Sequence, residues 1–274
     1  MQPLDGTKIA ADILERLSNL PKPKKFIAGI LVGESPVSAS FQRLKQKTAE
    51  RLGLDYRIYD FPATETNDTL RRKIGAIVNH TTCGGALIQL PLPAHLNAGY
   101  LLNAIPQSKD IDVLAERSLG AFYAGRSAVL PPAAGVVEEL VRVTDFPLAT
   151  STVAVVGPGL LIGRPVATWL MRRCKELLIF YRESDYALLK NADLIVSGVG
   201  TASLLRPDML KDGASVIDFG YGANGEGRLA GDFDAPSRSG NASSFYTPTP
   251  GGTGPILVAK LFENFFLLNS KRKD

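Results

Sequence analysis

The sequence has very few of the residues that build disulfide frameworks and metal centres. Its 274 residues include only two cysteines, Cys83 and Cys174, and only two histidines, His80 and His95. The cysteines lie far apart and lack the CxxC spacing of a zinc or redox site. Reduced thiols are therefore the default, and we expect neither a disulfide-stapled fold nor a bound metal.

Long apolar runs and dense positive charge are missing too. No run is long enough to cross a bilayer, and the first residues, MQPLDGTKIA, lack the apolar segment of a signal peptide. The net charge is only +4, and outside the tail SKRKD the basic residues are spread out, whereas a nucleic-acid surface needs a denser patch. We expect a cytoplasmic protein that binds neither membrane nor nucleic acid. Its mild basicity suits a small anionic substrate or cofactor.

What the sequence does have is the alternating pattern of an α/β protein. With 45% hydrophobic residues it can fill a large core, as one large domain or two ordinary ones. Short apolar runs at 26–33, 56–62 and 85–93 predict strands, and the segments 38–53 and 66–80 between them predict helices. This β-α-β-α-β order predicts a parallel sheet covered on both faces.

A second α/β unit follows a polar, irregular stretch. The break between Ala115 and Gly135 is the predicted domain boundary. Two such units predict a cleft between them, with ligands at the carboxyl ends of the strands. The predicted elements are a helix at 130–143, a strand, glycine loop and helix over 151–174, strands at 176–182, 192–200 and 214–221, and a final helix within 247–268.

The glycine loop of the second unit predicts a dinucleotide site. Gly157, Gly159 and Gly163 stand between a strand and a helix, with one residue more than the usual fingerprint spacing. Glycines let the backbone approach a pyrophosphate, and the helix N-terminus offers free N–H groups. Pro165 suits a first helical turn. The structural alternative is a tight turn without a ligand, and the flanking strands and helix argue against it.

The end of the next strand distinguishes NAD from NADP. An acidic residue there favours the ribose of NAD, and an arginine favours the 2′-phosphate of NADP. This sequence offers both, Arg182 and then Glu183. Because Arg182 comes first and directly ends the predicted strand, we predict NADP.

Lys45 is out of place in an otherwise amphipathic helix. Helical spacing puts Phe41, Leu44, Ala49 and Leu52 on one side, and Lys45 lies one turn after Phe41 within that apolar stripe. From the helix alone, a lysine whose stem covers apolar surface while its amine reaches water is the simpler interpretation.

Five stretches taken together resemble one family. In order they are VGESPVSASFQRLK, ALIQLPLP, KDID, GPGLLIGRP and TPTPGGTGP. The chain resembles the bifunctional methylenetetrahydrofolate dehydrogenase/cyclohydrolase family over nearly its whole length. The resemblance implies NADP-dependent oxidation of 5,10-methylenetetrahydrofolate and hydrolysis of the methenyl product to 10-formyltetrahydrofolate. It also implies a folate-binding domain at 1–120, a Rossmann domain at 121–253, a C-terminal helix at 254–274 packed on the first domain, and a homodimer formed through the Rossmann domains.

The resemblance assigns roles to individual residues. Lys45 matches the lysine of a Tyr-x-x-x-Lys motif, where an apolar wall would lower its pKa into a range for proton exchange. Gln89 matches the glutamine that hydrogen-bonds this lysine, and Asp112 matches the carboxylate that receives the pterin N–H groups. The other implied residues are Ser38, Phe41, Pro250, Gly251 and Gly252 for the substrate, and Gly157, Gly159, Gly163, Arg164, Pro165, Arg182, Ser184, Gly200 and Thr249 for the cofactor.

Each assignment has a structural alternative, and the chain departs from the family pattern in places. Gln89 can be a polar residue satisfied at a strand end, Asp112 can cap a loop, and 250–252 can form a turn. Phe41 stands where the family has tyrosine, so a hydroxyl near Lys45 is lost. Val113 follows KDID in place of glycine, so the backbone there can run differently. Two further departures are LPPAAG, without the family's cysteine and threonine, and Pro158 in the glycine loop.

Three other functions remain open on the sequence. One is a dehydrogenase without cyclohydrolase activity, because hydrolysis depends more on a general base than hydride transfer does. Another is a folate- or dinucleotide-binding protein without catalysis. The third is another two-domain Rossmann oxidoreductase, such as a shikimate-type dehydrogenase. Lys45, Gln89 and Asp112 together favour the bifunctional enzyme.

Overall fold

A computed structural model describes residues 1–33, 36–223, 229–235 and 244–270. The chain divides into two compact units. The three-stranded unit contains Asp12–Pro132 and the C-terminal part of the chain from Val258, and the six-stranded unit contains Met1–Ala11 and Ala133–Leu257. The division after Pro132 lies within the predicted break, later than residue 120.

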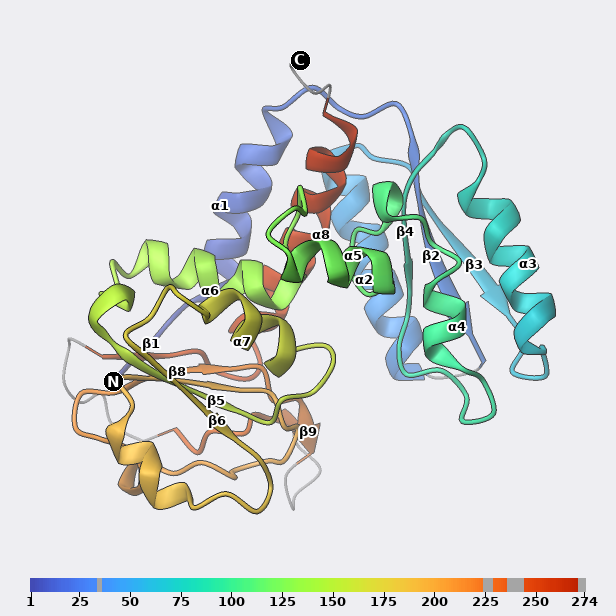
Figure 1. Ribbon diagram of the computed structural model, residues 1–274. Helices are drawn as coiled ribbons and strands as arrows, with labels where there is room; N and C mark the ends of the chain where they lie inside the picture. The colour runs from blue at the N-terminus through green and yellow to red at the C-terminus, as the bar shows by residue number, and fades with distance from the viewer. Residues whose placement is uncertain (34–35, 224–228, 236–243, 271–274) are drawn as a thin grey trace. The chain divides into compact units, whose positions relative to one another are not determined.

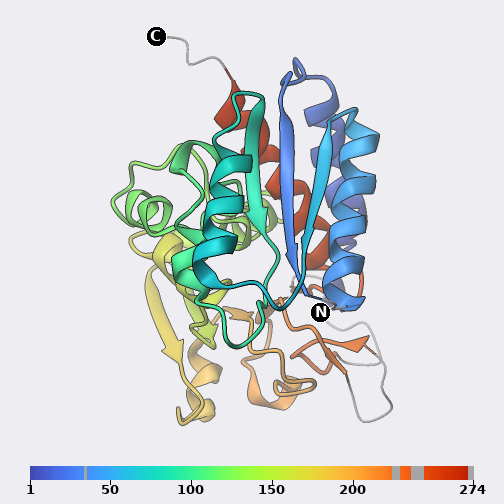
Figure 2. The same ribbon diagram turned by 90° about the vertical axis from the view of Figure 1, so that its right-hand side faces the viewer.

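The three-stranded unit is built around the predicted parallel sheet. Its strands are β2 (Phe26–Val32), β3 (Tyr56–Phe61) and β4 (Cys83–Ile88), in the order β3-β2-β4, and both pairings are parallel. The crossover helices are α2 (Pro36–Leu52) and α3 (Asn67–Val78). Figures 1 and 2 show helices on both faces of this sheet, as the strand–helix alternation predicts.

One face of this sheet packs on α3. Thr66 caps that helix by accepting a hydrogen bond from the Thr69 N–H. Leu70, Ile74 and Val78 follow at four-residue spacing, so their side chains form one stripe against the sheet. The alternate residues of β2 complete this core, and they are Phe26, Ala28, Ile30 and Val32.

The opposite face meets α2, and here the predicted helix face is partly wrong. The helix begins at Pro36, two residues before the predicted segment 38–53. Ala49 and Leu52 are buried as expected, but Leu44 is 46% exposed while Gln42 is 1% exposed. The helix is therefore rotated from the apolar prediction, because a polar side chain at position 42 finds a partner inside the unit.

Part of helix α8 (Thr253–Asn269) packs within the three-stranded unit. The Asn264 side-chain amide donates to the carbonyl oxygens of Ile111 and Leu130, both at 2.8 Å. The Phe262 ring lies 6.5 Å from the Tyr56 ring, between centroids. These contacts hold the loop that contains the KDID motif.

The six-stranded unit has a doubly wound parallel sheet. Its order is β1-β11-β8-β7-β5-β6, and every pairing is parallel. The central strands β5, β7 and β8 are wholly buried, which is the pattern of a sheet covered on both faces. The strands are β1 (Gln2–Pro3), β5 (Thr152–Val156), β6 (Glu176–Phe180), β7 (Leu194–Ser197), β8 (Ser215–Asp218) and β11 (Phe245–Tyr246).

The N-terminal residues belong to this six-stranded unit rather than to the predicted first domain. The Gln2 N–H donates to the Ser244 carbonyl at 2.8 Å, and β1 pairs with β11. A strand of two residues has no periodicity, so no sequence pattern predicts it. The remaining elements are α1 (Gly6–Ser18), α4 (Ala98–Leu102), α5 (Glu116–Tyr123), α6 (Pro132–Val143), α7 (Gly163–Leu170), β9 (Gly222–Ala223), β10 (Leu229–Ala230) and 3-10 turns at Gln107–Lys109, Leu148–Thr150, Tyr186–Asn191 and Pro207–Met209.

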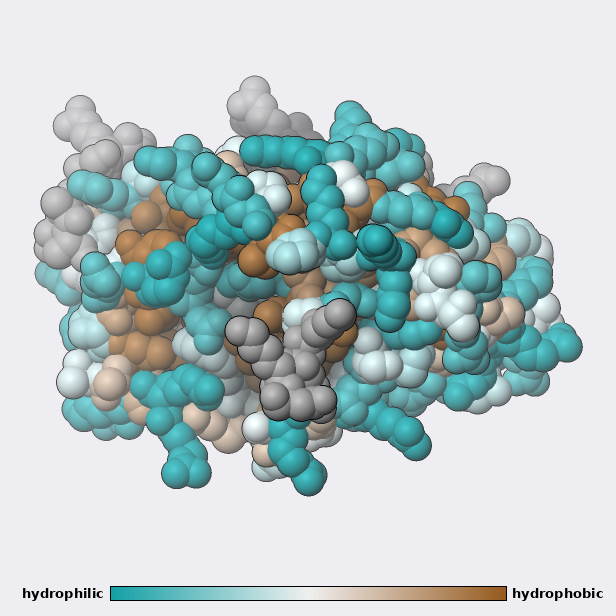
Figure 3. All heavy atoms as spheres, turned by 90° about the horizontal axis from the view of Figure 1, so that it is seen from above, coloured by the Kyte–Doolittle hydropathy of each residue, from teal (hydrophilic) through white to brown (hydrophobic). Residues whose placement is uncertain are grey.

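The surface has the mixed character of an ordinary globular protein. On the face that Figure 3 shows, hydrophilic side chains surround scattered apolar ones. Among the helices that the structure describes, none is long and apolar enough to cross a membrane.

Asn264→Leu should destabilise the protein, because it leaves two carbonyl groups without their donor. A buried carbonyl that loses its donor costs about 1–3 kcal/mol, and because the Leu130 carbonyl is only partly buried we expect a total of about 2–4 kcal/mol. Urea unfolding measures the change. The control is Leu267→Gln on the same helix, where the side chain is exposed and the effect should be small. A parental midpoint for Asn264→Leu would contradict the role of this amide.

Candidate active site

Lys45 and Gln89 form a direct hydrogen bond within the three-stranded unit. The Lys45 amine donates to Gln89 Oε1 at 2.7 Å. Gln89 follows β4, and its own NH₂ group donates to the Leu90 carbonyl at 2.9 Å. That second bond fixes the orientation of the amide, so its oxygen faces the amine. The predicted lysine–glutamine pair is present.

The surroundings of Lys45 favour its neutral form. Burial lowers the pKa of the Lys45 amine, and the charge of Asp112 partly offsets this by raising it. The Gln89 oxygen accepts a hydrogen bond from either –NH₃⁺ or –NH₂. An amide partner therefore positions the amine while leaving it free to gain or lose a proton, which a carboxylate partner would not.

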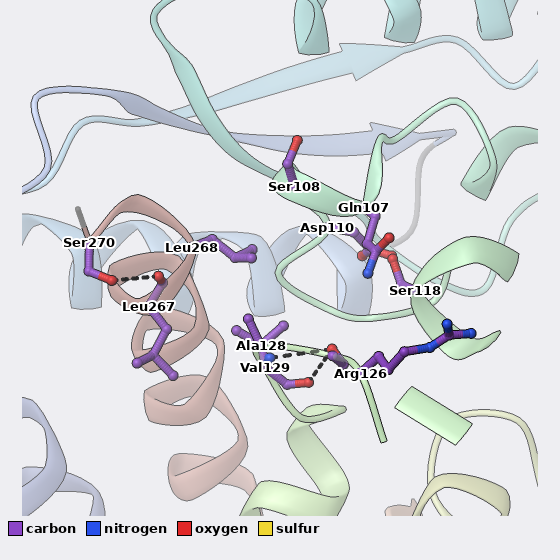
Figure 4. Close-up of a pocket in the computed structure, with 11 residues that line it drawn as sticks. Gln107, Ser108, Asp110, Ser118, Arg126, Ala128, Val129, Leu267, Leu268 and Ser270 are labelled. Carbon is purple, nitrogen blue, oxygen red and sulfur yellow. Dashed lines mark hydrogen bonds between the residues drawn. The ribbon is translucent and has the colours of Figure 1, made fainter. Parts of the chain in front are cut away.

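The two carboxylates of KDID have different roles. Asp110 is buried, and its carboxylate accepts from the backbone N–H groups of Leu114 and Ala115 at 3.0 and 2.8 Å. Asp110 is therefore the loop-capping aspartate of the motif. Figure 4 shows it beside Ser118 in a pocket that Leu267 and Leu268 line from the end of α8.

Asp112 has no such backbone partners within the described part of the chain. Burial raises its pKa to about 6; the charge of Lys45 acts to lower this pKa and that of Asp110 to raise it. Asp112 is thus a desolvated carboxylate close to the lysine, and its oxygen atoms are available to donors on a ligand.

Val113, directly after Asp112, has a left-handed backbone conformation. Its φ is 57°, in the left-handed region, and its side chain is buried. A β-branched residue in this region is strained by about 1–2 kcal/mol. The expectation that the backbone after Asp112 differs from that of the family stays a prediction.

The predicted substrate residues of α2 share a face with the lysine. Ser38, Phe41 and Lys45 follow at intervals of three and four residues, so their side chains lie along one side of the helix. Ser38 is buried and Phe41 partly buried. The aromatic ring predicted one turn before Lys45 is present. Because it belongs to phenylalanine, the hydroxyl of the family's tyrosine is absent.

The glycine loop of the six-stranded unit fits a pyrophosphate. A Cβ on Gly157, whose φ is 79°, would lie 2.7 Å from Val199 Cγ2, and one on Gly163 would meet Pro158 Cα at the same distance. A Cβ on Gly159 would reach no described atom within 4 Å, so open space lies there. Helix α7 begins at Gly163, with Pro165 in its first turn and no side-chain cap among the described residues.

Arg164 and Ser184 are committed to the protein itself. Arg164 Nε donates to the Pro158 carbonyl at 3.0 Å, which braces the glycine loop. Ser184 Oγ accepts from the Tyr181 N–H at 2.8 Å in the turn after β6. The prediction that Arg182 directly ends the strand is wrong, because β6 ends at Phe180. Arg182 is nevertheless exposed in the following turn, as is Glu183.

Two buried aspartates escaped the sequence analysis. The Asp232 carboxylate accepts from Ser197 Oγ at 2.6 Å and from the N–H groups of Val199 and Thr201 at 2.7 and 2.8 Å. It therefore fixes the loop after β7, which contains the predicted Gly200, where φ is 78°. The sequence signal was the motif GDFD, which has no distinguishing periodicity.

Asp218 fixes the neighbouring loops of the same unit. Its carboxylate accepts from the N–H groups of Gly220 and Phe233 at 2.6 and 2.9 Å, and its carbonyl accepts from Thr253 Oγ1 at 2.9 Å. Burial raises the pKa of Asp218 to about 6, although its backbone donors oppose this. An aspartate at the end of the apolar strand SVID was the available signal.

The TPTPGG loop is held as a turn within the six-stranded unit. Thr249 Oγ1 donates to the Gly220 carbonyl at 3.2 Å. Pro250 follows a cis peptide bond, and Gly251 has a φ of 93°. A Cβ on Gly252 would overlap the Pro248 carbonyl. The geometry of the turn therefore accounts for these residue types without a ligand. Their role in folate binding stays a prediction.

The predicted site residues thus fall into two groups. Ser38, Phe41, Lys45, Gln89 and Asp112 belong to the three-stranded unit, and all the others belong to the six-stranded unit. The cleft between the units remains a prediction. Across the described ranges, no three His, Cys, Asp or Glu side chains gather in a way that could hold a metal ion.

A Rossmann-type unit with a pyrophosphate-fitting loop, together with a buried lysine–amide pair, defines a two-domain, dinucleotide-dependent enzyme. Residues 4–112 match the model of the tetrahydrofolate dehydrogenase/cyclohydrolase catalytic domain, and residues 131–273 match that of its NAD(P)-binding domain. The chain belongs to the tetrahydrofolate dehydrogenase/cyclohydrolase family.

Curated relatives agree with this assignment over the full length. The bifunctional protein FolD of Nautilia profundicola is 33% identical over 269 residues, which cover 95% of this chain and 94% of that protein. The FolD protein of Staphylococcus aureus strain JH9 is 32% identical, over 98% of this chain and 97% of its own length.

Solved structures give the same result. The FolD methylenetetrahydrofolate dehydrogenase/cyclohydrolase of Campylobacter jejuni superposes with a TM-score of 0.92 at 30% identity, covering 98% of both chains. The Trypanosoma brucei enzyme, solved with NADP and an inhibitor, gives 0.88 at 28% identity over 97% of this chain and 96% of its own. A shikimate dehydrogenase of Thermus thermophilus reaches 0.53 at 17% identity over 89% of this chain and 93% of its own, which shows a shared fold alone.

Asp112→Asn should stabilise the protein at pH 8. The folded-state pKa of Asp112, about 6, lies above the ordinary 3.8, so folding disfavours the carboxylate and its contribution to stability falls as pH rises through this range. Removing the charge should add about 1–3 kcal/mol to the free energy of unfolding at pH 8 and less at pH 5. Urea unfolding at both pH values measures this, with exposed Asp60→Asn as control. A variant that is less stable at pH 8 would contradict the desolvation argument.

Proposed function

We propose that Lys45 transfers protons in the cyclohydrolase step, and that Gln89 and Asp112 serve it from the same unit. The family makes the chain an NADP-dependent methylenetetrahydrofolate dehydrogenase and methenyltetrahydrofolate cyclohydrolase. The single observation that carries the proposal is the 2.7 Å bond from a partly buried lysine amine to an amide oxygen.

Hydrolysis of the methenyl group needs a base beside the reacting carbon. Water adds to this carbon and loses a proton, and opening of the ring leaves a formyl group. Because burial lowers the pKa of Lys45, a larger fraction of its amine is neutral and able to accept that proton. Gln89 keeps the amine in position, since its oxygen orientation is fixed by the bond to Leu90.

Asp112 binds the pterin in this proposal. Its carboxylate accepts two N–H donors from the pterin ring, and an ionised carboxylate is the stronger acceptor. With a pKa raised to about 6, Asp112 is mainly ionised at pH 7 and above. Phe41, one turn before Lys45, offers its ring for stacking on the aminobenzoyl group.

The six-stranded unit binds the cofactor. NADP, when bound, accepts a hydride from the methylene carbon. The loop with Gly157, Gly159 and Gly163 cradles the pyrophosphate, and the open space at Gly159 supports this role. Arg182 is exposed beyond β6 and binds the 2′-phosphate. Asp232 keeps the loop with Gly200 in place for the same ligand.

The missing hydroxyl at Phe41 favours a second candidate function, a dehydrogenase with weak cyclohydrolase activity. A tyrosine there would hydrogen-bond or relay protons to Lys45, and general acid–base assistance contributes about 10²–10⁴-fold. Hydride transfer depends mainly on alignment of the two ligands and is less affected. Separate measurement of methenyl formation and methenyl decay distinguishes the two candidates.

We also propose that the chain acts in the cytoplasm as a homodimer formed through its Rossmann unit. Strand β6 lies at the edge of the six-stranded sheet and contains Leu177, Leu178 and Ile179, which are only partly buried. An apolar edge strand of this kind is suited to pairing with a second copy.

Lys45→Met should abolish most cyclohydrolase activity and leave the fold intact. Methionine keeps the apolar stem and removes the amine, so hydrolysis of methenyltetrahydrofolate should fall about 10²–10⁴-fold. Decay of its absorbance measures the rate. Lys47→Met, an exposed lysine on the same helix, is the matched control. Hydrolysis at the parental rate in the Lys45 variant would remove Lys45 from the mechanism.

Arg182→Ala should weaken NADP far more than NAD, because only NADP has the 2′-phosphate. A charge-assisted hydrogen bond contributes about 1.5–3 kcal/mol, so the dissociation constant for NADP should rise about ten- to a hundredfold. Titration calorimetry with each dinucleotide measures this, and Glu183→Gln in the same turn is the control. Equal losses for both dinucleotides would move phosphate recognition to another residue.

A further inference from the structure

A buried hydrogen bond ties strand β3 to the helix that carries Lys45. The Tyr56 hydroxyl donates to Gln42 Oε1 at 2.5 Å, and both side chains are buried. Gln42 stands three residues before Lys45 on α2, which is one helical turn. The bond therefore fixes the turn of the helix from which the amine projects.

Gly29 provides the space for this bond. A Cβ at this position would lie 2.5 Å from Gln42 Oε1 and still closer to the Tyr56 hydroxyl. Gly29 is in the middle of the buried strand β2, where glycine weakens a strand and packs nothing. Its φ is not positive, so backbone conformation does not require glycine here. The requirement is the close approach of these two side chains.

Stability alone does not explain the arrangement. The Gln42 side-chain nitrogen is buried and finds no hydrogen-bond partner among the described residues. A buried N–H without a partner is unfavourable, and apolar side chains of similar size would avoid this cost. The chain keeps a strand glycine and a buried hydroxyl against an incompletely paired amide, and this amide stands one helical turn before Lys45.

The same carboxylate acts on the tyrosine and on the lysine. Burial raises the pKa of Tyr56, and the charge of Asp112 raises it further, so the hydroxyl stays protonated. Asp112 also acts on Lys45, while Asp110 acts on Asp112. Tyr56 therefore lies in the electrostatic field of the candidate active site without being one of the residues the family motifs assign.

We propose that Tyr56 is a positioning residue for Lys45, acting through its hydrogen bond to Gln42. Gln89 holds the amine itself, and Tyr56 holds the turn of α2 behind it. Position 41 is phenylalanine, and the tyrosine hydroxyl that bonds this turn of α2 comes from β3. The inference rests on the proposed function of Lys45.

The experiment compares Tyr56→Phe with the double variant Gln42→Leu/Tyr56→Phe. The double variant removes both partners of the bond, so neither is left buried without the other. Its stability should therefore exceed that of Tyr56→Phe and approach that of the parent. Tyr59→Phe is the matched control. Tyr59 is on the same strand, but it packs against the core cluster on the α3 side of the sheet. Each protein is measured for hydrolysis of methenyltetrahydrofolate from pH 6 to 10 and for urea unfolding. The Lys45 side chain is titrated by ¹³C NMR, with Lys45→Met identifying its signal.

In Tyr56→Phe the hydrolysis kcat should fall about tenfold or more, with little change in KM, because the amine is misplaced while the substrate contacts remain. Looser packing of the turn should admit water, so the measured pKa of Lys45 should rise toward its ordinary value. The double variant should regain stability and keep the low kcat and the raised pKa. Tyr59→Phe should match the parent in all three.

An unchanged Lys45 titration and kcat in Tyr56→Phe would overturn the proposal. Recovery of both together with stability in the double variant would also overturn it, since Tyr56 would then have a structural role only. If Tyr56→Phe does not fold, the double variant alone decides between these outcomes. Parental hydrolysis by Lys45→Met would instead refute the proposed function of Lys45, while the NMR titration still tests the positioning role.

Discussion

The hydrogen bond from a partly buried lysine amine to an amide oxygen is the interaction on which the candidate site of the three-stranded unit depends. The bond from Lys45 to Gln89 joins α2 to the end of β4, and the buried stripe of α2 is arranged to permit it. Burial disfavours the charged form of a lysine, and a carboxylate partner would keep the amine protonated. The amide satisfies the amine in either protonation state, so the helix can bury a titratable group without committing it to one form.

Buried carboxylates have a different purpose elsewhere in the molecule. Asp110, Asp218 and Asp232 each accept backbone N–H groups, and each fixes a loop that follows or adjoins a parallel strand. Such loops line the carboxyl ends of the strands, where α/β proteins bind their ligands. Asp112 stands apart from these three, since its neighbours are charged groups and its pKa is raised by burial. One motif, KDID, therefore supplies both a loop anchor and a carboxylate available to a ligand.

Sequence periodicity predicted most of the secondary structure and failed where burial did not follow polarity. The buried strands and the helix α3 have strong patterns, and they lie where expected. On α2, Leu44 is exposed and Gln42 is buried, the reverse of what their polarity predicts. Gln42 is buried because its side chain accepts a hydrogen bond from Tyr56. The short strand β1 and the contacts of Asp232 depend on residues far apart in the chain, which no local pattern encodes. The resemblance located Lys45, Gln89 and Asp112, but it did not distinguish the structural from the available aspartate of KDID.

The contact of Gly29 with Tyr56 and Gln42 has a consequence for how this sequence can change over time. A Cβ at position 29 would displace the two bonded side chains, so a larger residue there is incompatible with the Tyr56–Gln42 bond as it stands. A β-branched residue at position 29 therefore requires a smaller side chain at position 42 or 56. The three positions are therefore coupled, so the stability changes of substitutions at them should not simply add.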